Sequence, residues 1–231
     1  MICSLVGLPF HYLLRWPCSP FTAVGLVLGL VSFFNILYGT LVGISKFEVK
    51  DIEFHHPNLP KAFDGYRIVQ LSDIHIGSWI DNEKTINELV ELVNAQKPDL
   101  IVFTGDLVNQ RSCELEGFQD ILAQLHAKDG VYSILGNHDY GSYYHWKNLK
   151  EQVNNIDNLI RMQKTMGWKL LNNEYDILHH EGDSIALIGV ENDGEPPFSQ
   201  FADLKKATKG TDGMFRILLS HNPTRWRREV L

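Results

Sequence analysis

Four short apolar segments of strand length set the strongest limit on what this chain can fold into. They are rich in β-branched, aliphatic and aromatic residues, as buried strands are. They cover residues 66–72, 100–104, 131–135 and 215–220. Segments with helical periodicity separate the first three of them. Strands that alternate with helices predict an α/β (α+β layered) fold.

Weaker patterns predict the remaining elements of this fold. Residues 46–54 alternate apolar and polar side chains, which is typical of a half-buried strand. Asp81 is expected to cap a helix with an apolar face, and a second helix should carry Phe118 to Leu125. We also expect a longer helix from about His145 to Met166, a hairpin from residues 175–180 and 184–190, and a helix starting at Pro223.

The N-terminal segment differs from the rest of the chain. No charged residue occurs between Arg15 and Lys46, and most of residues 21–44 are apolar. About 20 apolar residues cross the hydrocarbon core of a bilayer, so we predict one transmembrane helix at about 21–44. A cleaved signal peptide and a buried core helix are the alternatives, and the apolar run is too long for the first. We therefore expect an N-terminal apolar segment at 1–45 and a folded domain at 46–231.

This segment predicts that the protein lies at a membrane, with the lipid bilayer as a partner. It would cross once, or more often if the N-terminus is incomplete. The Lys and Arg residues on either side of the span favour a cytoplasmic domain only weakly, which leaves the membrane side open.

Each of the four apolar segments is followed by a polar cluster. The clusters are Asp73-Ile74-His75, residues 105–109, residues 136–139 and His221-Asn222-Pro223. Ligands of open α/β folds bind beyond the carboxyl ends of the strands, so four buried strands would bring these clusters to one rim. Carboxylate, amide and imidazole donors suit Mn²⁺, Fe, Zn²⁺ or Mg²⁺.

Each cluster also has an ordinary interpretation as a helix cap or a turn. Four such clusters in this order are improbable as turn chemistry alone, and the conjunction favours a metal site. The formal net charge of −7 argues against a protein that coats nucleic acid. The cysteines, three in all, show no CxxC spacing, so neither a disulfide framework nor a cysteine zinc site is indicated.

At these residues the chain resembles the calcineurin-like metallophosphoesterase family. The motifs are DIHIG at 73–77, GDLVN at 105–109, GNHD at 136–139 and SHNP at 220–223, and the resemblance covers roughly residues 64–231. The apolar leader followed by NLPKAFDGYRIVQLSDIHIG is similar to the membrane-anchored bacterial branch. The resemblance implies a β-sandwich flanked by helices, with a centre of two divalent metal ions that hydrolyses phosphate esters.

The resemblance also implies a role for each motif residue. Asp73 and His75 would bind the first metal, Asp106 would bridge both, and Asn137 and His221 would bind the second. His138 would protonate the leaving group or stabilise the attacked phosphoryl group, and Asp139 would shape the substrate side. Position 109 is Asn where some members carry an acidic residue that supports the histidine. The family's Gly-His-x-His motif does not occur, so we expect the domain to be incomplete at its C-terminus.

The expected function is hydrolysis of a phosphomonoester, phosphodiester or pyrophosphate through a hydroxide held between the two metals. The substrate would be a phosphorylated small molecule or a lipid-linked one, because the enzyme is anchored. A metal-binding module with impaired catalysis and a membrane scaffold protein are the alternatives. Oligomeric state, metal identity and the substrate itself are left open by the sequence.

Overall fold

The computed structural model describes residues 20–195 and 199–225 of the chain. Its contacts divide the chain into two units, residues 1–52 and residues 53–231. The described part of the first unit contains helix α2 (Pro20–Leu41) and a 3-10 turn, η1 (Gly43–Ser45). The helical segment Ala23–Ser45 is long and apolar enough to cross a membrane. Its mean hydropathy is 1.9, and none of the residues that give this value is buried. That observation rests on length and composition alone.

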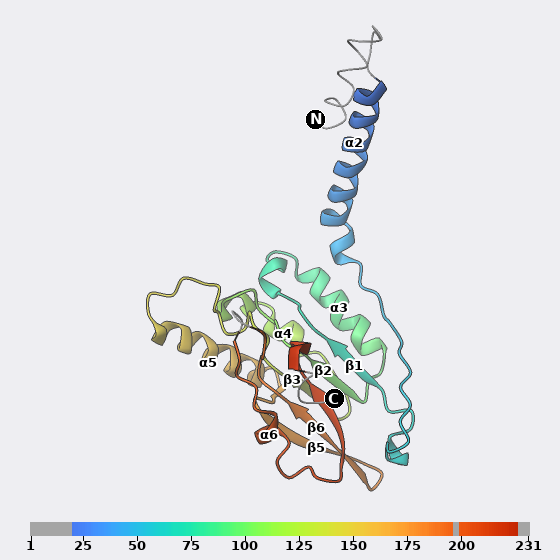
Figure 1. Ribbon diagram of the computed structural model, residues 1–231, viewed down its shortest axis with the longest axis vertical. Helices are drawn as coiled ribbons and strands as arrows, with labels where there is room; N and C mark the ends of the chain where they lie inside the picture. The colour runs from blue at the N-terminus through green and yellow to red at the C-terminus, as the bar shows by residue number, and fades with distance from the viewer. Residues whose placement is uncertain (1–19, 196–198, 226–231) are drawn as a thin grey trace. The chain divides into compact units, whose positions relative to one another are not determined.

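The second unit is a mixed α/β domain (Figure 1). Its strands are β1 (Ile68–Leu71), β2 (Leu100–Phe103), β3 (Val131–Ser133), β4 (Lys169–Leu170), β5 (Glu174–His180), β6 (Asp183–Gly189) and β7 (Phe215–Leu219). Its α-helices are α3 (Glu83–Ala95), α4 (Gln119–Leu122), α5 (Leu149–Thr165) and α6 (Leu204–Ala207). The 3-10 helices are η2 (Lys61–Phe63), η3 (Ile76–Trp79), η4 (Ser112–Leu115) and η5 (Pro223–Arg225).

The strands form two sheets that pack face to face. The first sheet has the order β1-β2-β3-β4 and is parallel throughout, while the second has the order β5-β6-β7. Strands β5 and β6 form the expected antiparallel hairpin, and β7 runs parallel to β6. One apolar core contains Val102 and Tyr132 of the first sheet together with Leu178, Leu187 and Leu219 of the second. The sandwich and the α/β class predicted from the sequence are confirmed.

The outer face of the first sheet is covered by other parts of the chain. All four residues of β2 are buried, so both of its faces must be covered. Phe103 points away from the sandwich core, and its ring lies 5.5 Å from that of Trp168, which follows α5. Strand β1 is an edge strand of alternating exposed and half-buried residues, and edge strand β7 is mostly half-buried, so the expectation that all four strands are buried is wrong for β1 and β7.

One predicted strand does not form. Residues 46–54 form no strand; all but Phe47 are exposed, and among the described residues no strand pairs with them.

The helix boundaries also differ from those predicted. Asp81 has a φ of 66° and does not cap α3; the residue before the helix is Asn82. Helix α4 is much shorter than expected, although Phe118 and Leu125 are buried. The long helix starts only at Leu149, because Asn148 caps it by accepting a hydrogen bond from the N–H of Glu151. The predicted helix at Pro223 begins as η5, and residues 226–231 lie outside the described residues.

Candidate metal centre

The loops that follow β1 and β2 are tied together by their backbones. The N–H of Asp73 donates to the carbonyl of Gly105 at 3.0 Å, and the N–H of His75 donates to the carbonyl of Asp106 at 3.1 Å. These bonds continue the parallel pairing of β1 with β2 beyond the last strand residues. As a result, the first two polar clusters of the sequence lie side by side.

Three of the predicted ligands have a left-handed backbone. The φ angles of Asp73, His75 and Asp106 are 54°, 47° and 58°. This region is uncommon for residues other than glycine, and such strain costs about 1–3 kcal/mol at each position. Four other non-glycine residues, Asp81, Lys97, Asn173 and Glu181, also have a positive φ, so the left-handed backbone is not confined to the residues whose side chains converge here.

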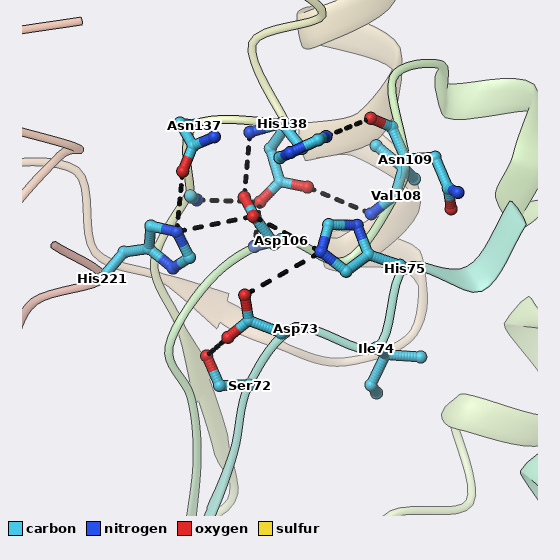
Figure 2. Close-up of polar contacts among 12 residues, drawn as sticks. Ser72, Asp73, Ile74, His75, Asp106, Val108, Asn109, Asn137, His138 and His221 are labelled. Atoms are coloured by element: carbon cyan, nitrogen blue, oxygen red, sulfur yellow. Dashed lines mark hydrogen bonds and ion pairs between the residues drawn. The ribbon is translucent and has the colours of Figure 1, made fainter. Parts of the chain in front are cut away.

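Asp106 lies at the centre of the cluster, as Figure 2 shows. Its side chain is only 4% exposed, and its Oδ2 atom lies 3.6 Å from Nε2 of His75 and 3.5 Å from Nε2 of His221. Its other oxygen, Oδ1, accepts a hydrogen bond of 2.9 Å from the N–H of His138. Asp73 reaches the same group through its Oδ1 atom, 3.9 Å from Nε2 of His75. One carboxylate oxygen therefore faces two imidazoles that come from different sheets.

His221 is oriented by a main-chain carbonyl. Its Nδ1 atom lies 2.9 Å from the carbonyl oxygen of Thr104, which can only accept, so Nδ1 carries the proton. Neutral His221 therefore turns an unprotonated Nε2 toward the side-chain oxygen of Asn137, 2.9 Å away. The amide nitrogen of Asn137 donates to the hydroxyl of Tyr143 at 3.0 Å, which directs that oxygen toward His221. Two acceptors this close require a cation or a proton between them.

His138 is held by its backbone to Asp106 and by its ring to Asn109. Its Nδ1 atom donates to the main-chain carbonyl of Asn109 at 2.6 Å, which leaves Nε2 free of that contact. Its ring packs edge-on against the ring of His75, with centroids 4.7 Å apart, and tilts against the ring of Tyr143 at the same distance. The half-exposed ring of Tyr143 thus lies next to both Asn137 and His138.

Asp139 lies beneath the loops that carry the other predicted site residues and is hydrogen-bonded to their backbone. It is completely buried, and its two oxygens accept hydrogen bonds from the N–H groups of Asp106, Leu107, Val108 and Gly136. Burial raises the pKa of Asp139 to about 7, against the lowering effect of the N–H of Gly136, and the charge of Asp106 raises it further. The carboxylate of Asp139 therefore supports the backbone of residues 106–108 and 136, and its expected role in shaping the substrate side stays a prediction.

Two groups of side chains could each hold a metal ion by the spacing of their donor atoms. One consists of His75, Asp106 and His138, and the other of Asp73, Asp106 and His221; within each group the atoms lie within 4.8 Å of one another. Asp106 belongs to both, as a bridging ligand would. The remaining members are divided differently from the sequence-based expectation, which placed Asp73 with His75 and left His138 out.

Sequence reasoning missed the groups that orient the imidazoles. The carbonyls of Thr104 and Asn109 fix His221 and His138, and main-chain atoms carry no signature in residue identity. Tyr143 was missed as well, although it follows the GNHD motif closely in the sequence. A tyrosine a few residues after a motif can point in many directions from a loop, so the sequence alone does not place it at the site.

Comparison with known proteins places these motifs in context. Residues 66–230 match the sequence model of the calcineurin-like phosphoesterase family. A transmembrane protein with metallophosphoesterase domain from Danio rerio is 29% identical over 196 residues, which are 81% of this chain and 42% of that protein. The UDP-2,3-diacylglucosamine pyrophosphatase LpxG of Chlamydia trachomatis is 28% identical over 204 residues, covering 72% of this chain and 60% of LpxG. The chain thus spans 42% and 60% of the length of these two relatives.

Among solved structures, TT1561 of Thermus thermophilus aligns with a TM-score of 0.45 and 17% identity, over 67% of each chain.

Proposed function

Because the chain belongs to the calcineurin-like phosphoesterase family, we propose that it is a metal-dependent hydrolase of phosphate esters that is anchored to a membrane. The functional domain would begin at about residue 46, after an N-terminal segment whose span covers about residues 21–44. Its substrate would be a phosphomonoester, a phosphodiester or a pyrophosphate.

The observation that carries this proposal is the environment of Asp106. A single buried carboxylate oxygen faces Nε2 of His221, the nitrogen without a proton, at 3.5 Å and Nε2 of His75 at 3.6 Å. The side-chain oxygen of Asn137 approaches the same nitrogen of His221 to 2.9 Å. Acceptor atoms that converge in this way repel one another, and a cation bound among them removes this repulsion. The donors therefore fit divalent metal ions.

We propose that Asp73, His75 and Asp106 hold one ion and that Asp106, Asn137 and His221 hold the other. The donors are oxygen and imidazole nitrogen without a thiolate, which suits Mn²⁺, Fe, Zn²⁺ or Mg²⁺. Two such ions would supply Lewis acidity to the phosphoryl oxygens and would lower the pKa of a bound water. The carbonyl of Thr104, by fixing the tautomer of His221, leaves the ligating nitrogen unprotonated.

His138 would deliver a proton to the leaving-group oxygen. Its Nδ1 atom is committed to the carbonyl of Asn109, so the nitrogen that can exchange a proton with a substrate is Nε2. The N–H of His138 is bonded to Asp106, which fixes the distance between this group and the proposed ligands. Asp139 would act indirectly, by holding the backbone of residues 106–108.

The anchor favours a substrate that is itself held at a membrane. The apolar helix could place the domain at a bilayer surface, and one relative is named as a pyrophosphatase of UDP-2,3-diacylglucosamine, an acylated compound. We therefore propose a phosphorylated lipid or a lipid-linked phosphate ester ahead of a free small molecule. The bilayer would then be both the anchor and the source of substrate.

Two substitutions separate the proposed ligand from the proposed acid. Asp106→Asn should remove both bound metal and turnover, whereas His138→Ala should lower turnover about 100-fold or more and keep the metal. Metal content and hydrolysis of phenyl phosphate, whose leaving group needs a proton, would be measured on the full chain in detergent with added Mn²⁺. A chelator should abolish turnover, and fresh Mn²⁺ should restore it. His126→Ala, at an exposed histidine, is the matched control.

Other results would redirect the assignment. Loss of metal in His138→Ala would make His138 a ligand, in the group that it forms with His75 and Asp106. Stoichiometric metal without hydrolysis of any ester in the unaltered chain would indicate a metal-binding module and would refute the hydrolase proposal.

A further inference from the structure

The main chain at residue 109 decides how His138 is presented. The contact between Nδ1 of His138 and the carbonyl oxygen of Asn109 is 2.6 Å long, and that carbonyl has no proton to give. The ring therefore keeps its proton on Nδ1 and turns Nε2 toward the candidate metal centre. If this carbonyl moved, the ring of His138 could rotate and its proton would no longer be fixed on Nδ1.

The side chain of Asn109 takes no part in this contact. Its amide nitrogen donates to the hydroxyl of Ser78 at 3.0 Å, and in Figure 2 the side chain points away from His138. The position where some relatives carry a supporting acid thus supports His138 through its backbone. The control of His138 must then come from whatever fixes the backbone at residue 109.

Glu114 fixes that backbone. Its Oε2 atom accepts hydrogen bonds from the N–H of Asn109 at 2.6 Å and of Gln110 at 3.3 Å, and its Oε1 atom accepts one from Arg111 at 3.1 Å. The side chain is only 10% exposed. Hydrogen bonds to an ionised acceptor are stronger than those between neutral groups, especially where water is excluded. One carboxylate therefore holds three successive residues of the loop.

Gly77 closes the other side of this arrangement. A Cβ atom at Gly77 would lie 2.6 Å from Oε2 of Glu114 and 2.9 Å from Oδ1 of Asn109, which is too close for any real contact. The backbone of η3, directly after His75, must approach without a side chain for Glu114 to stay in place. Glu114 thus lies between the loop that carries His75 and the loop that holds His138.

We propose that Glu114 is a positioning residue for proton transfer, because it holds the Asn109 carbonyl against Nδ1 of His138 and so aims Nε2 at the leaving group. This inference rests on the proposed function, in which His138 is the acid. It assigns Glu114, outside every family motif of the sequence, to the reaction itself.

The leaving group of the substrate provides a readout that a structural role would not change. A phenolate of low pKa departs without a proton, whereas a phenolate of high pKa needs one. Glu114→Ala should lower kcat about tenfold or more on phenyl phosphate and less than about threefold on 2,4-dinitrophenyl phosphate, with KM and bound Mn²⁺ unchanged. Glu114→Gln keeps one acceptor oxygen and should fall between the unaltered chain and Glu114→Ala. All assays would use the full chain in detergent with Mn²⁺.

Glu151→Ala is the matched control. Glu151 lies in the first turn of α5, as Glu114 does in η4, and likewise accepts a backbone N–H, that of Lys147, whereas its hydrogen bonds go to residues 147 and 148 and not to the loop of Asn109. Its removal should change neither the rates nor their dependence on the leaving group. Gly77→Ala provides a second route, since a Cβ there would displace the Glu114 carboxylate; it should reproduce the leaving-group pattern of Glu114→Ala.

Equal losses on all leaving groups, or a loss that follows bound metal, would overturn the proposal and leave Glu114 a structural residue. Nitrogen-15 NMR of the histidines in the metal-free full chain adds a readout that needs no turnover. His138, assigned by its absence in His138→Ala, should carry its proton on Nδ1, and Glu114→Ala should yield a mixture of tautomers. An unchanged tautomer in Glu114→Ala would refute the positioning role. A complete lack of turnover in the unaltered chain would instead refute the proposed function, and the NMR result would still decide the positioning.

Discussion

Asp139 shows how a single buried acid can organise several loops. It accepts four backbone hydrogen bonds, three of them from the residues that follow β2. A buried N–H without an acceptor costs about 1–3 kcal/mol. The carboxylate is therefore as important for the shape of the site as any of the proposed ligands, although it does not reach the surface.

We predict that Asp139→Ala destabilises the domain, because four N–H groups would lose their acceptor. The loss should be at least about 3 kcal/mol, which corresponds to a melting temperature lower by roughly 6 °C or more. Thermal denaturation of the full chain in detergent measures it. Asp212→Ala is the control, since that side chain is 96% exposed and its ion pair with Arg216 should contribute less than about 1 kcal/mol. Equal melting temperatures for the two variants would contradict the supporting role of Asp139.

At the scale of elements, the ends of β2 and β3 come unusually close. A Cβ at Gly105 would lie 2.5 Å from the backbone nitrogen of Gly136, and a Cβ at Gly136 would lie 2.2 Å from Oδ1 of Asp106. Gly105 also has a φ of 100°, which L side chains rarely adopt. The two glycines let neighbouring strands deliver Asp106 and Asn137 to one point.

Gly105→Ala should therefore cost more than backbone strain alone. Gly117 has a similar φ of 87° but nothing within 4 Å of a Cβ, so Gly117→Ala isolates the strain, about 1–2 kcal/mol. The collision with Gly136 should add about 1–3 kcal/mol at residue 105 and should displace Asp106. Denaturation and bound Mn²⁺ would be compared for both variants. If they lose the same stability and both retain metal, the close approach of the two strands has no role in shaping the site.

At the scale of the whole molecule, the chain joins an apolar helix to an enzyme-like domain. The helix exposes large apolar residues along its length, among them Leu26, Phe34 and Ile36. Burial of such side chains in a lipid environment gains about 25 cal/mol per Å² of apolar surface. The described residues of the first unit include no core that could cover them.

We predict that the full chain partitions into membranes and that a variant lacking residues 1–45 does not. Fractionation of cell lysates with and without detergent measures this, with 4-nitrophenyl phosphate turnover as a check that the shortened chain is folded. Recovery of the full chain in the soluble fraction, or its cleavage near residue 45, would contradict a retained anchor.

Most of the strands and the polar clusters that follow them could be predicted from the sequence, because both depend on local chemistry, whereas β4, of only two residues, was not predicted. Apolar segments such as residues 100–104 cannot remain exposed, and a strand that ends in Gly-Asp or Gly-Asn-His places those side chains at the sheet edge. The sandwich was expected through resemblance to the family. The strand predicted at residues 46–54 was wrong because a strand also needs a partner, which alternation within one segment does not provide.

Only the tertiary structure decided what surrounds each candidate ligand. The carbonyls of Thr104 and Asn109, which fix the tautomers of His221 and His138, are main-chain atoms that every residue possesses. The burial of Asp139 depends on four N–H groups that face one point only after β2 and β3 pair. Residue identity sets which chemical groups are available, whereas distance, burial and hydrogen-bond direction arise from segments far apart in the sequence that meet only in the folded chain.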